Sequence, residues 1–281
     1  MPDTTRPWVL ITGCSSGIGK ALVGVCRGAG WGVVATARRE VDLAELPAGE
    51  DLRPLSLDVT SADSIARAAQ ACSDLRLVAV INNAGYGQMG PLEFVRSDEL
   101  RAQFETNVVG LQAVTNAFLP LIRQNAFKGE GRIVQVASML GRLSIPLAGP
   151  YNASKHAVVA LAETLRLEIG KEIPVVLVEP GAVASSFRAT IAKSWGDLPQ
   201  RVQGTRYERI LAGFMKAREK HAEQFAGSPE QAARRILKAL TQKHPPRRIL
   251  IRPEARLAGW AKALLPSAVW EWLLRRSYRL N

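Results

Sequence analysis

The sequence has few residues of the kinds that bind metal ions or form disulfides. Its 281 residues include three cysteines and three histidines. Their scattered positions match no metal-ligand spacing, so we expect no metal in the site. Three separated cysteines are also too few for a disulfide framework, which favours a reducing, cytoplasmic environment.

Long apolar runs are also absent. No stretch approaches the roughly 20 apolar residues that a membrane-spanning helix needs. The first residues show no basic segment followed by an apolar run, so we expect no signal peptide. The hydrophobic content of 47% and the charged content of 22% are ordinary for a soluble globular protein. A chain of this length can bury a full core as one domain.

Positive charge is in excess, and it is unevenly placed. The formal net charge is +12, and residues 244–281 contain eight Lys or Arg and two Glu. Such an excess can attract a nucleic acid, an anionic membrane surface or an anionic cofactor. No nucleic-acid-reading motif is present, so we expect no nucleic-acid partner.

The last 28 residues are predicted to form a basic amphipathic helical extension, 254–281. They carry Trp260, Trp270 and Trp272 among arginines. Such a helix can make weak peripheral contact with a membrane, close over a substrate pocket or pack on a partner subunit. We favour packing, because tryptophans in the final helices of a soluble enzyme are more often buried than membrane-facing.

Apolar strand-like segments alternate with helix-like segments along the chain. The expected strands cover 8–12, 33–37, 52–58, 77–82, 133–137, 175–178 and 249–251. Continuous apolar strands separated by helices predict an α/β fold: a doubly wound, mostly parallel seven-stranded sheet with helices on both faces. We expect one catalytic domain over 1–253, in which 183–228 covers the substrate.

A glycine-rich turn follows the first expected strand and opens a helix. It contains Gly13, Ser15, Ser16, Gly17, Ile18 and Gly19. Glycines at such a turn let the backbone approach a pyrophosphate, which rests on the helix N-terminus. The alternative is a tight strand-to-helix connection without a ligand. The strand before and the helix after favour a dinucleotide cofactor.

The second expected strand ends in Arg38 and Arg39, with no acidic residue before Glu40. An acidic side chain at this place binds the ribose hydroxyls of NAD, whereas an arginine pairs with the 2′-phosphate of NADP. A solvated arginine pair is the alternative. After a glycine-rich turn, the pair favours NADP(H) over NAD(H).

Ser138, Tyr151 and Lys155 suggest catalytic chemistry. Tyr151 and Lys155 are four residues apart, so they share one helix face. A free tyrosine has a pKa near 10, and a neighbouring ammonium lowers it. Ser138 follows a strand, where its hydroxyl could bind a substrate oxygen. Each feature alone is ordinary, but their order downstream of the glycine turn makes coincidence improbable.

Together these motifs resemble the single-domain branch of the short-chain dehydrogenase/reductase family, over about residues 8–190. The matches are Thr12 to Gly19, Asp58, Asn82 to Gly85, Asn107, Ser138, Tyr151, Lys155 and Pro180-Gly181. Looser patterns, such as Gly13-Cys14-Ser15-Ser16-Gly17, resemble hydroxysteroid- and retinol-dehydrogenase-like members. The resemblance implies a Rossmann-type fold.

The resemblance also implies residue roles. Tyr151 would be the general acid/base, Lys155 would bind the nicotinamide ribose, Ser138 would orient the carbonyl, and Asn107 would hold a water in a proton relay. The remaining cofactor-binding residues would be Asp58, Val59, Asn83, Ala84, Gly85, Pro180, Gly181, Val183 and Ser185. The family usually has threonine where this chain has Ser185, which retains a hydroxyl for the carboxamide.

The segment after Gly181 is rich in apolar residues. Phe187, Ile191, Trp195, Leu198, Ile210, Phe214 and Met215 would face a wall of Leu140, Leu143, Pro146 and Leu147. Such a pocket suits a bulky apolar ketone or alcohol, although these residues could also simply pack the lid down. The family resemblance further implies a homodimer or tetramer.

The sequence therefore predicts an NADP(H)-dependent oxidoreductase that interconverts a carbonyl and a secondary alcohol. The alternative from another class is an NADP-sensing binding protein with the same fold and little turnover. A nucleotide-sugar epimerase or dehydratase is a third reading, but such enzymes typically have another glycine spacing and a longer C-terminal domain.

Overall fold

A computed structural model describes residues 5–46, 48–127, 129–183, 187–214, 226–251, 259, 261–262, 264–278 and 280. Its centre is a seven-stranded sheet in the order β3-β2-β1-β4-β5-β6-β7, and every neighbouring pair is parallel. The strands are β1 (Trp8–Ile11), β2 (Gly32–Ala37), β3 (Leu52–Ser56), β4 (Leu77–Asn82), β5 (Arg132–Val136), β6 (Val175–Glu179) and β7 (Arg248–Leu250).

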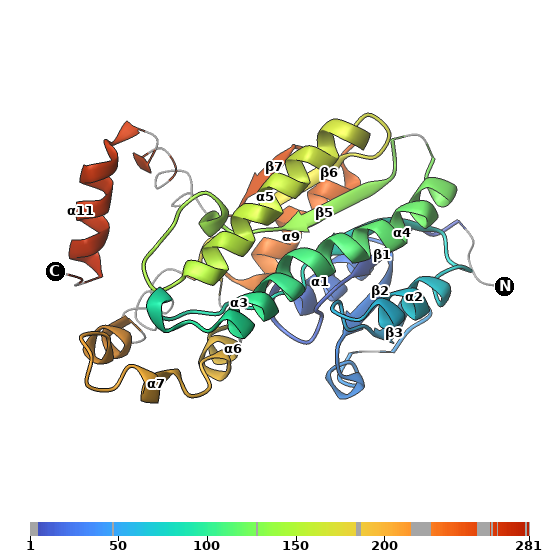
Figure 1. Cartoon of the computed structure of the whole chain (residues 1–281). Helices are drawn as coiled ribbons and strands as arrows, with labels where there is room; N and C mark the ends of the chain where they lie inside the picture. The colour runs from blue at the N-terminus through green and yellow to red at the C-terminus, as the bar shows by residue number, and fades with distance from the viewer. Residues whose placement is uncertain are drawn as a thin grey trace.

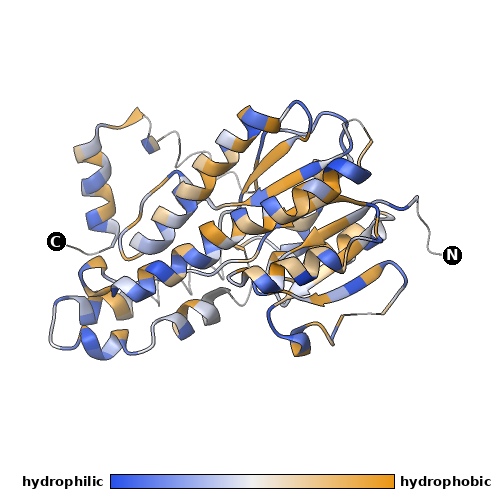
Figure 2. Cartoon of the chain, turned by 45° about the vertical axis from the view of Figure 1, so that its right-hand side comes forward, coloured by the Kyte–Doolittle hydropathy of each residue, from blue (hydrophilic) through white to orange (hydrophobic). Residues whose placement is uncertain are grey.

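The central strands are apolar on both faces because helices cover both faces. Trp8 and Leu10 of β1 belong to one buried cluster, whereas Val9 and Ile11 belong to the other. This separation follows from the alternation of side chains along a strand. Figure 2 shows the hydrophobic strands at the centre, with hydrophilic residues on the outer helices.

Two groups of helices form the outer layers (Figure 1). On one face α1 (Gly17–Gly28) and α9 (Pro229–Thr241) supply residues to the buried cluster. On the other face lie α2 (Ala62–Gln70), α4 (Leu111–Asn125) and α5 (Gly149–Ile169). The predicted doubly wound α/β fold is confirmed, and the sheet is wholly rather than mostly parallel.

The strand order creates a crevice between β1 and β4. After β1 the chain winds outward through β2 and β3, then returns to β4 and winds the other way. The connections that follow β1 and β4 therefore separate in opposite directions at the carboxyl ends of the two strands. Ligands of open α/β sheets bind at this switch point.

The apolar pattern over residues 98–124 predicts one long helix, but the structure has an irregular turn within this stretch. Helix α3 (Ser97–Phe104) passes into a π-helical turn, η3 (Glu105–Gly110), which continues into α4. Such turns carry an extra residue and are frequent at functional sites. Asn107 lies in this one.

Three helices lie at one end of the molecule, away from the N-terminus (Figure 1). They are α6 (Phe187–Ser194), α7 (Leu198–Arg201) and α11 (Ser267–Ser277). Of the predicted extension 254–281, the structure describes 259, 261–262, 264–278 and 280. Within the described parts of the chain, no helix is long and apolar enough to cross a membrane.

Candidate active site

The glycine-rich turn has a backbone that only glycine adopts readily. Gly13 and Gly17 have φ values of 74° and 58°, in the left-handed region. A Cβ on Gly13 would lie 2.9 Å from the Cα of Ala84, and one on Gly19 would collide with the carbonyl oxygen of Gly13. The turn therefore packs directly on the segment after β4 and opens α1, which has no acidic residue in its first turn.

Thr12 and Asn83 join the carboxyl ends of β1 and β4. The Thr12 hydroxyl accepts hydrogen bonds from the backbone N–H groups of Asn83 and Ala84, both at 2.9 Å. The Asn83 amide donates to the carbonyl oxygens of Thr12, at 2.9 Å, and Gly13, at 3.1 Å. Thr12 was not among the predicted site residues, although its place before the first glycine was the available signal.

The end of β2 lies beside the glycine turn. The Cys14 N–H donates to the Thr36 carbonyl at 2.7 Å, and Arg38 follows two residues beyond Thr36. The two arginines differ in their contacts. Arg39 donates to Asp42 with Nε–Oδ2 at 2.9 Å, whereas Arg38 is exposed and forms no ion pair with any residue that the structure describes. Arg38 is the better placed of the two for a phosphate.

Asp58 follows β3 close to Arg38. Its carboxylate accepts from the Thr60 N–H at 2.9 Å and from the Thr60 hydroxyl at 2.7 Å. Burial raises the pKa of the Asp58 carboxyl, but the Thr60 hydrogen bonds and the charge of Arg38 outweigh burial and hold the pKa below its usual value. The neighbouring Val59 side chain belongs to the core, which leaves mainly its backbone for a ligand.

Ser138 ends the loop after β5 and caps a short turn. Its Oγ accepts from the Leu140 N–H at 3.1 Å, and the residue is buried. A hydroxyl that accepts one hydrogen bond still has a proton to donate. Ser138 can therefore donate to a substrate oxygen.

Tyr151 and Lys155 lie one turn apart at the start of α5. They are 7% and 5% exposed, and the Lys155 Nζ is 5.9 Å from the centre of the Tyr151 ring. The Lys155 ammonium donates to the Val136 carbonyl of β5 at 2.9 Å. Burial lowers the pKa of Lys155 to about 8, so the group is mostly charged at neutral pH.

Asn107 ties three segments together through its side chain. Its Nδ2 donates to the Tyr86 carbonyl at 3.0 Å and to the Ser154 Oγ at 3.1 Å, and its Oδ1 accepts from the Tyr86 N–H at 3.1 Å. Both N–H bonds of the amide are thus used, so a relay water would need the remaining lone pair of Oδ1 or a backbone group. Ser154, fully buried, was missed as a site residue although it stands between Tyr151 and Lys155.

Gly85 lies between Asn107 and Lys155. A Cβ built on Gly85 would be 2.9 Å from the Asn107 Oδ1 and 3.7 Å from the Lys155 Nζ. Pro180 follows β6 and lies beside the turn after Ser138, because its carbonyl accepts from the Met139 N–H at 3.0 Å. After Gly181, Val183 forms a bridge with Gly227. Ser185 lies outside the described residues.

The predicted substrate end is an apolar cluster that includes Tyr151. Its buried members are Met89, Leu140, Leu143, Leu147, Ala148, Tyr151, Ile191 and Phe214. Trp270 and Tyr278, from and just after α11, pack against this cluster, and the Tyr278 ring lies 5.9 Å from that of Phe214. Pro146, expected in this wall, is not a member of the cluster and lines a pocket with residues of α5 instead, and Met215 is outside the described residues.

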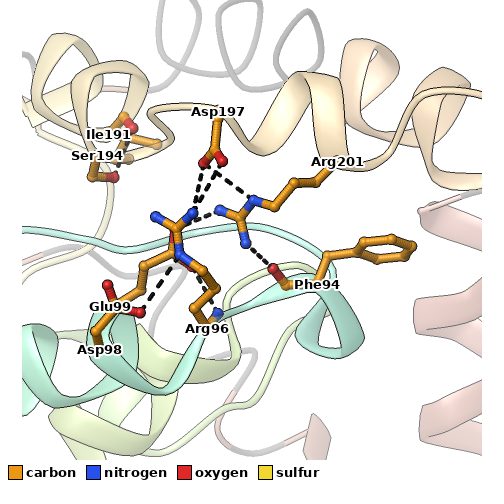
Figure 3. Close-up of polar contacts among 8 residues, drawn as sticks. All are labelled: Phe94, Arg96, Asp98, Glu99, Ile191, Ser194, Asp197 and Arg201. Atoms are coloured by element: carbon orange, nitrogen blue, oxygen red, sulfur yellow. Dashed lines mark hydrogen bonds and ion pairs between the residues drawn. The ribbon is translucent and has the colours of Figure 1, made fainter.

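Ion pairs hold the covering segment to α3 (Figure 3). Arg96, before α3, reaches both carboxylate oxygens of Asp197 at 3.0 Å. Arg201 of α7 contacts Glu99 of α3 and the Phe94 carbonyl. These contacts span about a hundred residues of sequence, and they fix α6 and α7 beside the apolar cluster.

This fold and these residues define a class of protein, an α/β oxidoreductase with a Ser–Tyr–Lys constellation beside a dinucleotide crevice. The family model described as short chain dehydrogenase matches residues 7–195. The chain belongs to the short-chain dehydrogenase family, and it is an oxidoreductase of the kind that acts on CH–OH or C=O groups.

Individual relatives agree with this assignment. NADPH-dependent 3-dehydrocapnine reductase from Ornithobacterium rhinotracheale is 30% identical over 92% of this chain and 93% of its own. 17-beta-hydroxysteroid dehydrogenase type 6 from Rattus norvegicus is 31% identical over 97% and 89%. A short chain dehydrogenase/reductase from Burkholderia phymatum, solved in complex with NAD, superposes with a TM-score of 0.79 at 26% identity, over 92% of this chain and 94% of that one. The predicted family membership is confirmed.

Proposed function

We propose that this protein is an NADP(H)-dependent reductase or dehydrogenase that interconverts a bulky apolar ketone and its secondary alcohol. The observation that carries the proposal is the bond of Lys155, one helical turn after Tyr151, to the Val136 carbonyl, two residues before Ser138. Tyr151 also belongs to the apolar cluster. The catalytic roles of these residues are those that the family resemblance implies.

The residues around the crevice suit a dinucleotide. The left-handed Gly13 and Gly17 shape the turn, and the first turn of α1 offers backbone N–H groups without a competing acidic residue. Gly85 packs closely against Asn107 and Lys155, and a Cβ there would lie 2.9 Å from the Asn107 Oδ1. The glycine turn would hold the pyrophosphate, Asp58 the adenine and Lys155 the nicotinamide ribose. When bound, the cofactor supplies or accepts the hydride.

Arg38 supports a preference for NADP(H). Arg38 forms no ion pair with a carboxylate among the described residues, and such a guanidinium can bind the 2′-phosphate through charge-assisted hydrogen bonds. The side chain of Arg39 is already engaged by Asp42. The name of the Ornithobacterium rhinotracheale relative points the same way, whereas the Burkholderia phymatum structure contains NAD.

In the proposed reduction, the chain's own residues handle the oxygen and the proton. Ser138 donates a hydrogen bond to the substrate carbonyl and orients it. Tyr151 gives its phenolic proton to the developing alkoxide, and the adjacent Lys155 ammonium stabilises the phenolate that remains. Asn107 holds the loop at Tyr86 and the Ser154 hydroxyl in place around this pair.

The apolar cluster supports a bulky apolar substrate. Leu143, Leu147, Ile191 and Phe214 gather around Tyr151, and the lid supplies part of the wall. Apolar walls with a few polar groups are typical of small-molecule pockets. We also propose that the enzyme works in the cytoplasm as a homodimer or tetramer, with its C-terminal segment packed over the substrate end.

A screen of carbonyl substrates tests the proposal. The full-length protein with NADPH would be given aliphatic, aromatic, steroid and retinoid ketones and aldehydes, and NADPH oxidation would be followed by absorbance. We expect turnover with bulky apolar carbonyls. Tight NADPH binding by calorimetry without turnover of any carbonyl would instead favour an NADP-sensing protein.

A further inference from the structure

A carboxylate is buried at the end of β6, directly before Pro180 and Gly181. It belongs to Glu179, which is fully buried. Its side chain lies on the same face of the sheet as Val175 and Leu177, the face that α5 covers, because side chains alternate along a strand. A glutamate is almost never fully buried unless it is paired. Its partners therefore bear on the residues beside it, which are expected to bind the cofactor.

Two arginines from different elements face this carboxylate. Arg248 of β7 donates from Nη1 to Oε1 at 2.9 Å, and it also pairs with Glu163 of α5. Arg142 approaches the other oxygen, with its Nη1 3.8 Å from Oε2, which accepts no hydrogen bond among the described residues. Burial raises the pKa of the Glu179 carboxyl, and the charges of Arg248 and Arg142 oppose this effect. The ionised carboxylate therefore depends on Arg142 as well as on Arg248.

Arg142 directly follows the turn that begins at Ser138. This turn, η4 (Met139–Gly141), is closed by the Gly141 N–H, which donates to the Ser138 carbonyl at 2.9 Å. It packs on the helix that carries Tyr151, because a Cβ on Gly141 would lie 2.7 Å from the Lys155 carbonyl oxygen. A shift of Arg142 would therefore move the turn, and with it the Ser138 hydroxyl.

The C-terminal segment contacts the same arginine. The Lys262 ammonium donates to the Arg142 carbonyl at 2.8 Å, across 120 residues of sequence. A Cβ on Gly259 would lie 3.9 Å from the Arg142 Nη1, the nitrogen that faces Glu179. Arg142 is therefore the point at which the C-terminal segment, the end of β6 and the turn after Ser138 meet.

We propose that Glu179 and Arg142 are positioning residues that hold Ser138 in place for the reaction. The carboxylate holds the guanidinium from within the core, and Lys262 holds the backbone of the same residue from the C-terminal segment. The turn is thereby fixed, so Ser138 can donate to a substrate oxygen as a pre-organised group. This role rests on the proposed function, in which Ser138 orients the carbonyl.

Hydrogen exchange of the full-length protein tests the contact without an enzymatic assay. Arg142→Met keeps the apolar stem of the side chain and removes its charge, so the turn after Ser138 should loosen. We expect the amides of residues 139–142 to exchange at least about fivefold faster than in the unaltered protein. The Leu140 N–H is the most direct reporter, because it is bonded to the Ser138 Oγ.

Arg123→Met is the matched control. The Arg123 side chain is 45% exposed, close to the 43% of Arg142, and it also pairs with a carboxylate, that of Glu172. It lies in the last turn of α4, before β5 begins, whereas Ser138 follows the end of β5. This variant should leave the exchange of residues 139–142 within about twofold.

Steady-state kinetics separates positioning from general stability. With a carbonyl that the unaltered protein reduces, Arg142→Met should lower kcat about tenfold and change KM and NADPH affinity by less than about threefold, because an interaction of the transition state is weakened. Arg142→Lys keeps the charge and should recover most of the lost kcat. Glu179→Gln should behave like Arg142→Met, and the double variant should be no worse than either one, because both substitutions remove the same ion pair.

Exchange and kinetics each have a result that would overturn the proposal. Normal exchange of the turn in Arg142→Met would show that Arg142 does not hold it. Equal losses of kcat in Arg142→Met and Arg142→Lys, or an equal loss in Arg123→Met, would contradict a specific role of this charge. If Glu179→Gln does not fold, the variants of the half-exposed Arg142 decide. If the unaltered protein reduces no carbonyl, the proposed function fails, and exchange of the turn alone decides whether Arg142 holds Ser138.

Discussion

The Lys155 ammonium lies 5.9 Å from the centre of the Tyr151 ring and is held there by the backbone of β5. Its Nζ donates to the Val136 carbonyl at 2.9 Å. The strand rather than the helix therefore fixes the distance between the charge and the phenol. This arrangement keeps a cation beside the proposed proton donor, at the cost of burying an ammonium.

That burial makes the stability of the protein depend on pH through Lys155. Its pKa falls from 10.5 to about 8 in the folded protein. Below pH 8 both states are protonated, and burial of the charge costs about 3 kcal/mol. Between pH 8 and 10.5 the unfolded chain binds a proton that the folded chain does not, so stability rises with pH.

The comparison with Lys155→Met isolates this effect. We expect the free energy of unfolding of the unaltered protein to increase, relative to the variant, as the pH rises from 7 to 9.5. Urea denaturation at several pH values measures the difference. A constant difference across this range would show that Lys155 is not buried as the structure describes.

Arg38 and Arg39 should differ in their effect on cofactor affinity. Arg38→Ala should weaken NADPH by about 1.5–3 kcal/mol, the range for a hydrogen bond to a charged group, and leave NADH nearly unchanged. Arg39→Ala is the matched control, because Asp42 already engages Arg39. Fluorescence titration measures both. A native preference for NADH would contradict the phosphate assignment.

Variants of the two tryptophans of α11 can distinguish a packed C-terminal segment from one that contacts a membrane. Trp270 packs against the apolar cluster, whereas Trp272 is 54% exposed. We expect Trp270→Ala to raise KM for bulky substrates several-fold and Trp272→Ala to leave it unchanged, because burying a large apolar side chain contributes about 1.5–3 kcal/mol. If the protein sediments with anionic vesicles at low salt and Trp272→Ala abolishes this, the segment is a membrane-surface element instead.

The outer faces of α4 and α5 are expected to form an isologous dimer. Val114, Phe118 and Val158 of these helices are buried in the chain's own core and cannot form that contact. Leu167, 88% exposed on α5, is a better candidate. Light scattering should show at least a dimer, and Leu167→Asp should weaken it. Val41→Asp, at an exposed residue near β2, is the control.

The site was predictable where residues close in sequence carry the chemistry. The glycine turn, the order Ser138, Tyr151, Lys155 and the cap at Ser61 follow from local spacing, and the structure shows Ser61 accepting from the Ser64 N–H at 3.2 Å. Contacts between distant segments could not be read in this way. The pairing of Arg96 with Asp197 depends on how the lid folds back, and only the structure shows it.

The sequence also did not show which of two neighbouring side chains forms an ion pair. Arg38 and Arg39 are adjacent and chemically alike, yet Asp42 engages only one of them. The π-helical turn at Asn107 was missed because helical periodicity alone does not show one inserted residue. Pro146 was assigned to the substrate wall from its hydrophobicity, but only its neighbour Leu147 belongs to the apolar cluster that includes Tyr151.

The central claim is that Tyr151 donates the proton in a carbonyl reduction, and Tyr151→Phe tests it most directly. The variant keeps the ring within the apolar cluster and removes the hydroxyl. With the best carbonyl found in the NADPH screen, kcat should fall at least about 100-fold, the scale of a positioned acid. NADPH affinity should stay within about threefold, since less than about 0.7 kcal/mol of binding is at stake. A Phe variant with near-normal kcat on every accepted substrate would contradict the account.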